Sequence, residues 1–401
     1  MNNFRLLTVF FLLLFSFGTT AQTPNQTLMV GAQQFSEYVA FLKNKRVGLV
    51  VNATSRVSKD LHLVDYLISK GVNVTVLFAP EHGIRGEIAA GEKVVDGIDL
   101  STGLSVISLY GKHKKPTRDD LKKIDVLVFD MQDVGVRFYT YISTLHLVME
   151  AAAENNTQLL VLDRPNPNGD YIAGPIMQPQ FKSFVGMHAI PVVHGLTIGE
   201  LALMINGEQW LENAIQIKAR DLKIIPVKNY THQTPYSLPV NPSPNLRTDV
   251  AVRHYASLGL FESTTISVGR GTATPFEVIG YPDPRLKINT QFQIDDVASA
   301  WPQRGKLSYG ERYGKSDDAK MSKNDHFSIK AYYNWYWKMR DLGYTSKQIV
   351  SRPHWLGKLI GNDNVLKQIE KRVSYQKIEA SWKPDLEKYR AMRKLYLLYA
   401  E

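Results

Sequence analysis

The sequence predicts an α/β protein in which a Rossmann-like domain with a mostly parallel sheet precedes a smaller α+β domain. Short apolar runs alternate with amphipathic helical patterns in the N-terminal half, and this alternation is typical of βαβ units. The pattern changes further on, where prolines become frequent between residues 165 and 244. A chain of 401 residues is also long for one small core. We therefore predict the Rossmann-like domain at residues 22–215 and the auxiliary domain at 216–401.

Five apolar runs of the first half are predicted to be buried strands. They are residues 46–52, 74–79, 104–109, 125–130 and 158–162. Apolar residues at helical spacing predict the helices between and after them, at 61–68, 117–124, 142–152 and 197–210. Strands that are apolar along their whole length are typical of a parallel sheet that is covered by helices on both faces.

Residues 1–21 have the pattern of a cleaved secretory signal peptide. Arg5 provides the positive charge, residues 6–17 are almost wholly apolar, and residues 19–21 are small. The apolar run is short for a membrane span, although an uncleaved anchor helix is the alternative interpretation. No later segment reaches the roughly 20 apolar residues that a spanning helix needs. We expect an exported protein, periplasmic or secreted, without stable membrane insertion after signal cleavage.

The composition and the absence of several motifs exclude some kinds of site. The chain has no cysteine, which rules out disulfides, thiol nucleophiles and thiolate metal ligands. The net charge of +10 comes from basic residues spread along the chain, which suits acidic partners such as anionic cell-wall glycans. Nucleic-acid-binding motifs, phosphate-binding loops and the HExxH and GxSxG motifs are all absent. Accordingly, neither a nucleic-acid partner nor a cofactor or metal is predicted.

Polar clusters directly follow three of the predicted strands. They occupy residues 80–83, 130–135 and 163–167. Ligands bind at the carboxyl ends of the strands in open parallel α/β sheets, because all of those loops emerge on one side. We therefore expect the three clusters to converge on one crevice.

The candidate catalytic residues are acids and a histidine in these loops and one acid further on. Glu81 and His82 offer a general acid or base, although Glu81 could instead cap a following helix. Asp133 lies deeper in its loop than Asp130, whose place at a strand end equally suits a helix cap or an arginine partner. Glu262 is a further candidate acid, with a structural salt bridge as the alternative.

A second group of side chains is predicted to bind the ligand. Guanidinium groups suit carboxylates, and tyrosines can stack on a sugar or fill a core. Gly269 and Gly271 flank Arg270 and allow the backbone to approach a ligand closely. The set comprises Arg85, Arg137, Tyr139, Asn166, His194, Asn245 and Arg270. For His194, a satisfied structural histidine is the more common alternative.

With these motifs in this order, the sequence resembles the exo-β-N-acetylmuramidase family, the NamZ-type glycoside hydrolases. The resemblance covers nearly the whole chain from Val47 onward. Six motifs carry it, and each is modest alone but specific in this order. They are residues 78–86 (FAPEHGIRG), 132–141 (QDVGVRFYTY), 163–167 (DRPNP), 194–202 (HGLTIGELA), 242–245 (PSPN) and 269–276 (GRGTATPF).

The resemblance implies a cleft between a Rossmann-like and an auxiliary domain, and release of N-acetylmuramic acid from the non-reducing end of peptidoglycan fragments. Its substrate carries a lactyl carboxylate, which an arginine-rich cleft would recognise. Glycoside hydrolysis needs a proton donor and usually a second group near the anomeric carbon. Glu81 is our choice for the donor with His82 as helper, Asp133 for the second group, and Glu262 as the reserve.

Two other functions compete with this interpretation. A metal-dependent hydrolase could use Asp130, Asp133, His82 and His194, although these residues form no compact ligand motif. A non-catalytic protein could bind muropeptides in the same cleft without cleaving them. The acids and the anion-binding arginines together favour the enzyme.

Overall fold

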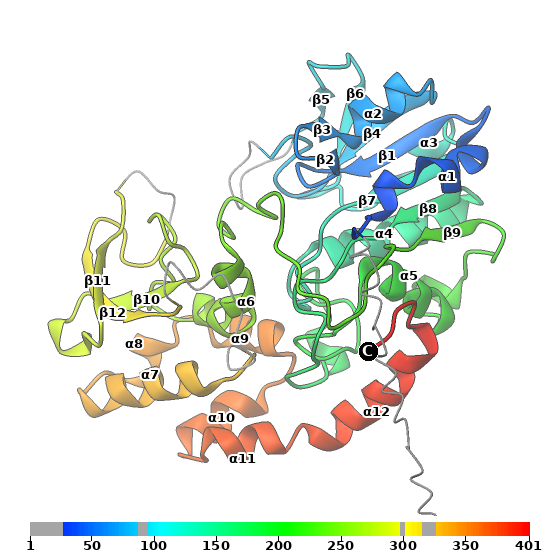
Figure 1. Cartoon of the computed structure of the whole chain (residues 1–401). Coiled ribbons are helices and arrows are strands. Elements are labelled where there is room, and N and C mark those ends of the chain that lie inside the picture. Colours follow the sequence, from blue (N-terminus) through cyan, green and yellow to red (C-terminus); the bar gives the residue numbers. More distant parts are fainter. Residues whose placement is uncertain (1–26, 87–94, 297–300, 315–325) are drawn as a thin grey trace, which may run out of the picture.

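A seven-stranded sheet lies at the centre of the protein, in the order β5-β6-β4-β1-β7-β8-β9 (Figure 1). The computed structural model describes residues 27–86, 95–296, 301–314 and 326–401. Neighbouring strands pair in parallel, except that β5 is antiparallel to β6. In spatial order the strands are β5 (Gly97–Ile98), β6 (Ser105–Ser108), β4 (Val74–Ala79), β1 (Val47–Val51), β7 (Val126–Asp130), β8 (Gln158–Leu162) and β9 (Leu222–Ile225). The predicted mostly parallel sheet is confirmed.

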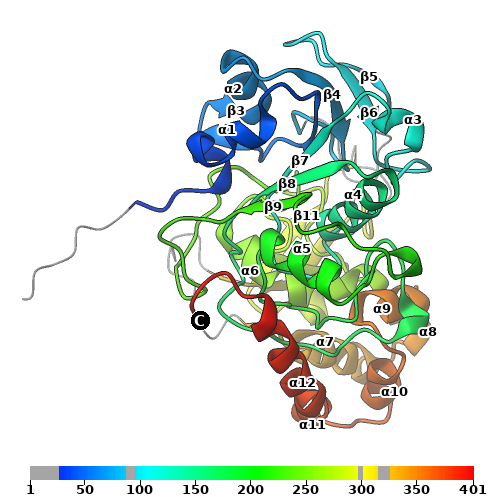
Figure 2. The same cartoon turned by 90° about the vertical axis from the view of Figure 1, so that its right-hand side faces the viewer.

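Successive residues of the central strands pack on opposite faces of this sheet. Leu49 and Val51 of β1 share a core with residues of α1 (Phe35–Leu42) and α2 (Leu63–Ser69). Val50, between them, joins the core formed with α4 (Tyr141–Asn155) and α5 (Ile198–Gly207). Figure 2 shows the two helix pairs on either side of the sheet. Because both faces are covered, every residue of β1 and β7 is buried, which explains their unbroken apolar sequences.

The remaining elements of the N-terminal part are short. A small hairpin pairs β2 (Arg56–Ser58) with β3 (Leu61–His62), and α3 (Arg118–Leu121) precedes β7. Thr197 caps α5 by accepting a hydrogen bond from the backbone of Glu200, and the side chain of Glu200 accepts from the amide of Thr197, which completes a capping box. The predicted signal peptide, residues 1–21, lies outside the described residues.

The C-terminal part combines a three-stranded antiparallel sheet with short helices. The sheet has the order β10-β12-β11. Its strands are β10 (Val278–Tyr281), β11 (Thr290–Gln293) and β12 (Leu307–Arg312), and the helices are α6 (Asp249–Leu258), α7 (Lys330–Asp341), α8 (Ser346–Ile349), α9 (Pro353–Ile360), α10 (Asn364–Glu370), α11 (Tyr375–Ala380) and α12 (Lys383–Arg393). The predicted smaller α+β part is confirmed. The boundary predicted at 215 falls before β9, which is still the edge strand of the large sheet.

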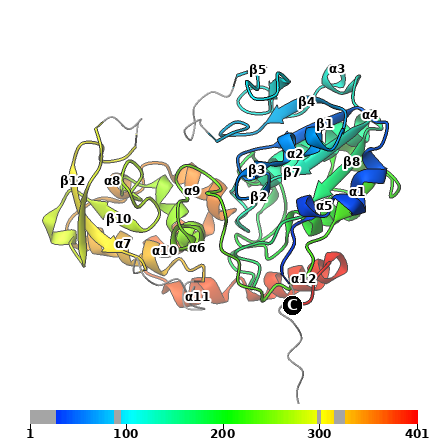
Figure 3. The ribbon, with the colours of Figure 1, turned by 45° about the horizontal axis from the view of Figure 1, so that its top comes forward.

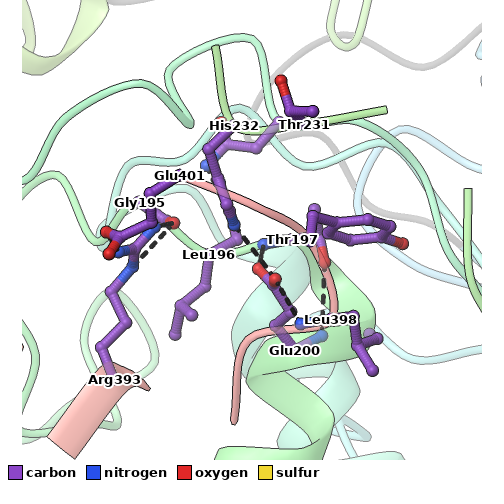
Figure 4. Close-up of polar contacts among 12 residues, drawn as sticks. Gly195, Leu196, Thr197, Glu200, Thr231, His232, Arg393, Leu398 and Glu401 are labelled. Carbon is purple, nitrogen blue, oxygen red and sulfur yellow. Dashed lines mark hydrogen bonds and ion pairs between the residues drawn. The ribbon is translucent and has the colours of Figure 1, made fainter. Parts of the chain in front are cut away.

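The last helices connect the two parts. Figures 1 and 3 show α10, α11 and α12 running from beside the small sheet to the large one. After α12 the chain ends against the N-terminal part, where the amide of Leu398 donates to Glu200 (Figure 4). Within the described part of the chain, no helix has both the length and the apolar character needed to cross a membrane.

Candidate active site

A small pocket holds Glu81 at the carboxyl end of the large sheet. Its volume is about 70 Å³. The walls come from the turn after β4, from the loop between β7 and α4, and from the C-terminal part. The lining residues are Glu81, His82, Phe138, Tyr139, Thr140, Tyr141, Ser243, Leu246, Tyr255, Arg270 and Phe276. The pocket therefore lies where the two parts of the chain meet, as the resemblance implies.

The carboxylate of Glu81 is held by two hydroxyl groups. Tyr110 donates to Oε1 at 2.9 Å and Thr140 donates to Oε2 at 3.0 Å. Residues 81–85 form turns, so Glu81 does not cap a helix. His82 beside it adopts a φ of 74°, which is uncommon for a residue with a side chain and is often found at functional sites. This arrangement fixes a carboxyl group at the pocket wall.

Aromatic side chains form much of the remaining wall. The hydroxyls of Tyr139 and Tyr141 donate to the carbonyl of Pro242 at 2.6 and 3.3 Å, so the turn at 242–246 is bound to this wall. The ring of Tyr255 meets that of Tyr139 edge to face. Burial, together with nearby groups, raises the pKa of both Tyr139 and Tyr255. These phenols are therefore neutral and serve the site as hydrogen-bonding and apolar surfaces.

Arg270 brings a positive charge to the pocket from the C-terminal part. Its Nη2 and Nε lie 2.5 and 3.1 Å from the same oxygen of Glu262, and its guanidinium also stacks on Phe276 and Trp301. Its Nη1 is buried and has no hydrogen-bond partner among the described residues. Gly269, just before Arg270, has a φ of 75°, a left-handed backbone conformation that glycine adopts more readily than other residues. The salt bridge considered for Glu262 is present, and Nη1 is the part of the guanidinium that it does not engage.

Asp133 and His194 pair with each other and do not line the pocket. Oδ2 of Asp133 accepts from the amide of Gly135 at 2.7 Å and lies 3.3 Å from Nε2 of His194. Nδ1 of His194 accepts from the amide of Leu196, which places the ring proton on Nε2, although this N–H forms no hydrogen bond among the described residues. The negative charge of Asp133 contributes to the raised pKa of Tyr139, after burial and the neighbouring tyrosines. The pair thus lies close behind the aromatic wall.

Arg137 is not brought to the pocket, because its guanidinium is fully buried among backbone carbonyls. Nη1 donates to Pro175 and Ile190 at 2.9 and 2.7 Å, and Nη2 donates to Leu359 at 2.9 Å. Burial lowers the pKa of Arg137 to about 9. The structure gives no support to the carboxylate-binding role predicted for Arg137. Its guanidinium instead joins the N-terminal part to α9 through the hydrogen bond to Leu359.

Arg85 is also committed elsewhere. It forms salt bridges with Asp65 at 2.9 Å and Asp99 at 3.0 Å, so its charge is already balanced by two carboxylates. The predicted role of Arg85 in anion binding therefore lacks support as well.

The two predicted asparagines lie beside the site rather than in it. Asn166 is buried, accepts from the amide of Asn168 at 2.8 Å and donates to the carbonyl of Leu196 at 2.9 Å. Its amide lies directly against Gly135, where a side chain would collide with it. Asn245 is half-buried in the turn at 242–246 that supplies Ser243 and Leu246 to the pocket.

Two of the strand-end clusters, at 130–135 and 163–167, contact each other, but neither lines the pocket of Glu81, so the single crevice predicted for all three clusters is not supported. Asp130 is fully buried and forms a two-point salt bridge with Arg164 at 2.6 and 2.8 Å, and Gln132 donates to the carbonyl of Pro165. Among the described residues, three suitable ligand atoms come close together at Glu150, Glu154 and Glu212, a cluster that includes no pocket residue. The metal-binding set considered from the sequence is therefore not assembled.

Sequence reasoning missed several residues that line the pocket or hold Glu81. Tyr110 follows the third predicted strand, so the rule that selected Glu81 and Asp133 also applied to it. Thr140 stood inside a quoted motif without being selected. Tyr255 and Phe276 carried no local pattern that indicated a site, because only the packing of α6 against the loop at 138–141 brings them there.

The chain matches known proteins over nearly its full length. Residues 47–250 match the family described as exo-β-N-acetylmuramidase NamZ, N-terminal, and residues 253–399 match its C-terminal counterpart. The peptidoglycan β-N-acetylmuramidase NamZ of Bacillus subtilis (strain 168) is 38% identical over 381 residues, which cover 90% of this chain and 89% of that protein.

Two solved structures from Bacteroides fragilis NCTC 9343, both titled DUF1343 family proteins, have the same fold. One is 40% identical with a TM-score of 0.83, and the alignment covers 94% of this chain and all of that one. The other is 30% identical with a TM-score of 0.78, over 93% and 99% of the two chains. The matches of both domains and of the Bacillus subtilis relative indicate the same family, and the chain belongs to the exo-β-N-acetylmuramidase NamZ family.

Proposed function

We propose that this chain releases N-acetylmuramic acid from the non-reducing end of peptidoglycan fragments, with Glu81 as the general acid. One observation carries the assignment of the acid: the Glu81 carboxylate is fixed by Tyr110 and Thr140 in a pocket that Arg270 also lines. Membership of the NamZ family and the activity named for the Bacillus subtilis relative support the reaction.

The chemistry needs a proton for the leaving oxygen, and Glu81 supplies it. A carboxyl group at a pocket wall can protonate the glycosidic oxygen as the bond to the anomeric carbon breaks. His82 follows Glu81 in the chain and also lines the pocket, which suits its proposed role as helper. Asp133 remains our proposal for the second group, with Glu262 as the reserve; because Asp133 does not line the pocket, it would act on the substrate through an intervening group rather than by direct attack at the anomeric carbon.

The substrate's lactyl carboxylate is assigned to Arg270. Of the three arginines predicted to bind it, Arg85 and Arg137 are held by other groups. Arg270 lines the pocket and has an N–H group at Nη1 without a partner among the described residues. A charge-assisted hydrogen bond from this group would favour muramic acid over a neutral hexosamine.

We also propose that the protein is exported, to the periplasm or beyond the cell. The signal-like pattern of residues 1–21 supports this, and the proposed substrate is a cell-wall polymer. Detection of the mature protein without residues 1–21 in an extracytoplasmic fraction would test the proposal. A full-length protein found in the cytoplasm would contradict it.

The proposed reaction is tested by release of free N-acetylmuramic acid from a muramic acid–glucosamine disaccharide. We expect release by the wild type and a large loss in Glu81→Gln, whereas Glu387→Gln, an exposed acid of α12, should behave as the wild type. Undiminished release by Glu81→Gln would move the acid role to Asp133 or Glu262. Tight binding of muramyl ligands without any cleavage would identify a non-catalytic binding protein instead.

A further inference from the structure

A second and larger cavity lies between residues 175–179 and the helices α10 to α12. Its volume is about 520 Å³, and it shares no lining residue with the pocket of Glu81. Cavities of about 300–1,000 Å³ are typical of small-molecule sites. The helices that form it run along one edge of the molecule in Figure 1. The proposed hydrolysis makes no use of this cavity.

The polar groups of the cavity are mainly neutral carboxamides. They belong to Gln178, Asn362, Asn364 and Gln368. Asn364 is exposed and Gln368 is half-buried, and no described residue forms a hydrogen bond with either side chain. A carboxamide both donates and accepts hydrogen bonds, so it can bind hydroxyl and acetamido groups without favouring an anion or a cation.

The charged lining residues neutralise each other. Among the described lining residues, the charged side chains are Asp385 and Lys388, whose Oδ1 and Nζ atoms lie 3.2 Å apart on α12. This differs from the pocket of Glu81, where Arg270 has an N–H group that no described residue accepts from. The larger cavity therefore suits an uncharged ligand.

Aromatic and aliphatic side chains form the floor. Trp382 and Tyr389 are 8% and 2% exposed, and Met177 is 4% exposed. Tyr389 is held in place because its hydroxyl donates to the carbonyl of His194 at 2.7 Å. A rigid aromatic floor below a rim of amides matches a sugar ring, which has an apolar face and a polar edge.

We propose that this cavity is a second glycan-binding site, which takes a neutral N-acetylhexosamine segment rather than muramic acid. Its floor accepts the apolar face and the acetamido methyl group, and its carboxamides bind the hydroxyl and amide groups. The proposal rests on the proposed function for the glycan nature of the ligand. Such a site would hold a fragment at a position separate from the pocket where its terminal residue is cleaved.

The test is binding of chitotriose, a neutral trimer of N-acetylglucosamine, to the mature protein by titration calorimetry. Ala189 is exposed and lines the cavity, so Ala189→Trp fills the site from its rim without disturbing the core. Gln368→Leu removes one rim carboxamide. We expect each variant to weaken chitotriose binding at least tenfold. Ala391→Trp adds the same bulk to an exposed position of α12 outside the lining and should bind as the wild type.

A second comparison separates this site from the catalytic pocket. Arg270→Ala changes only the pocket of Glu81 and should leave chitotriose binding unchanged, whereas Ala189→Trp should still release N-acetylmuramic acid from the disaccharide. Absence of chitotriose binding by the wild type would overturn the proposal while leaving the hydrolase assignment intact. Binding that Arg270→Ala abolishes and Ala189→Trp preserves would also overturn it, because the ligand would then occupy the catalytic pocket.

Discussion

The hydroxyl of Tyr110 lies 2.9 Å from Oε1 of Glu81, so a residue that follows β6 orients the acid that follows β4. These strands are neighbours in the sheet. The other carboxylate oxygen is bound by Thr140, at the start of α4. Three segments that are distant in sequence therefore determine the direction of one carboxyl group, and each can be altered separately.

Loss of the Tyr110 hydroxyl should slow the reaction without preventing substrate binding. A hydrogen bond to a charged group contributes about 1.5–3 kcal/mol, so Tyr110→Phe should lower kcat roughly ten- to a hundredfold with little change in KM. Thr140→Val should act in the same direction through the other oxygen. Steady-state release of N-acetylmuramic acid measures both, with Tyr66→Phe on α2 as the control. An unchanged kcat in both variants would show that the orientation of Glu81 does not limit the rate.

Arg270 should determine selectivity for the lactyl carboxylate. Arg270→Met should lower kcat/KM for a muramyl disaccharide roughly ten- to a hundredfold, because one charge-assisted hydrogen bond is lost. It should not lower any residual cleavage of the corresponding N-acetylglucosaminyl substrate. Since the single change leaves Glu262 without its partner, the double variant Arg270→Met/Glu262→Gln controls for stability. Equal losses on both substrates would assign Arg270 a structural role.

The central sheet and its covering helices were predictable from the sequence, because strands that are buried on both faces have apolar residues at nearly every position. The runs that became β1 and β7 are apolar at every residue but the last of β7, and the polar residue Asp130 there marks the strand end. β9 was missed, because it is a four-residue edge strand whose first three residues are only partly buried. Its membership of the sheet depends on pairing with β8, which local sequence does not reveal.

Local sequence signals identified some residues of the pocket. Glu81, selected by its strand end, and Arg270, selected by its flanking glycines, both line it. Arg137 does not line it, although it follows the same strand as Asp133. Its partners Pro175, Ile190 and Leu359 lie 38, 53 and 222 residues away and are backbone carbonyls, which leave no pattern in the sequence.

His62 should make the protein less stable in mild acid. Its Nε2 lies 2.8 Å from the carbonyl of Asn52 and its Nδ1 accepts from the amide of Val64, so the ring is held in one neutral tautomer. Burial lowers the pKa of His62 to about 4, whereas the unfolded chain takes up the proton near 6.5. The unfolded state thus binds more protons between these values, and stability is full above pH 6.5 and declines as the pH falls toward 4.

The expected contribution of His62 is roughly 3 kcal/mol, from the difference between the two pKa values. Urea unfolding at pH 7.5, 6 and 5 measures it against His62→Asn, whose side-chain oxygen can accept from the amide of Val64 in place of Nδ1 and which does not titrate. The wild type should lose more stability than the variant on going from pH 7.5 to 5. Parallel losses in both proteins would assign the acid sensitivity to other groups, such as the buried His146 and His188, whose pKa values burial also lowers.

The end of the chain should contribute to stability through Tyr399. Its hydroxyl donates to Oδ2 of the fully buried Asp163 at 2.5 Å and accepts from the amide of Val227 at 2.8 Å. Figure 4 shows the neighbouring contacts of this C-terminal segment, where Leu398 and His232 meet at Glu200. Tyr399→Phe leaves the amide of Val227 without this partner and removes one of the two hydrogen bonds to Oδ2 of Asp163, the other being donated by Thr197, which should cost about 1–3 kcal/mol.

This loss should grow with pH. Burial raises the pKa of Asp163 to about 6. Its hydrogen bonds lower the pKa in part, and the bond from Tyr399 has the largest lowering effect. Removing that bond raises the pKa further, so the ionised carboxylate is penalised more above pH 6, whereas below pH 4 it is protonated in either protein. Calorimetry should therefore show a larger fall in Tm for Tyr399→Phe at pH 8 than at pH 5, while the exposed control Leu395→Ala should match the wild type at both. A Tm difference that is the same at both pH values would mean that Tyr399 stabilises the fold through packing rather than through Asp163.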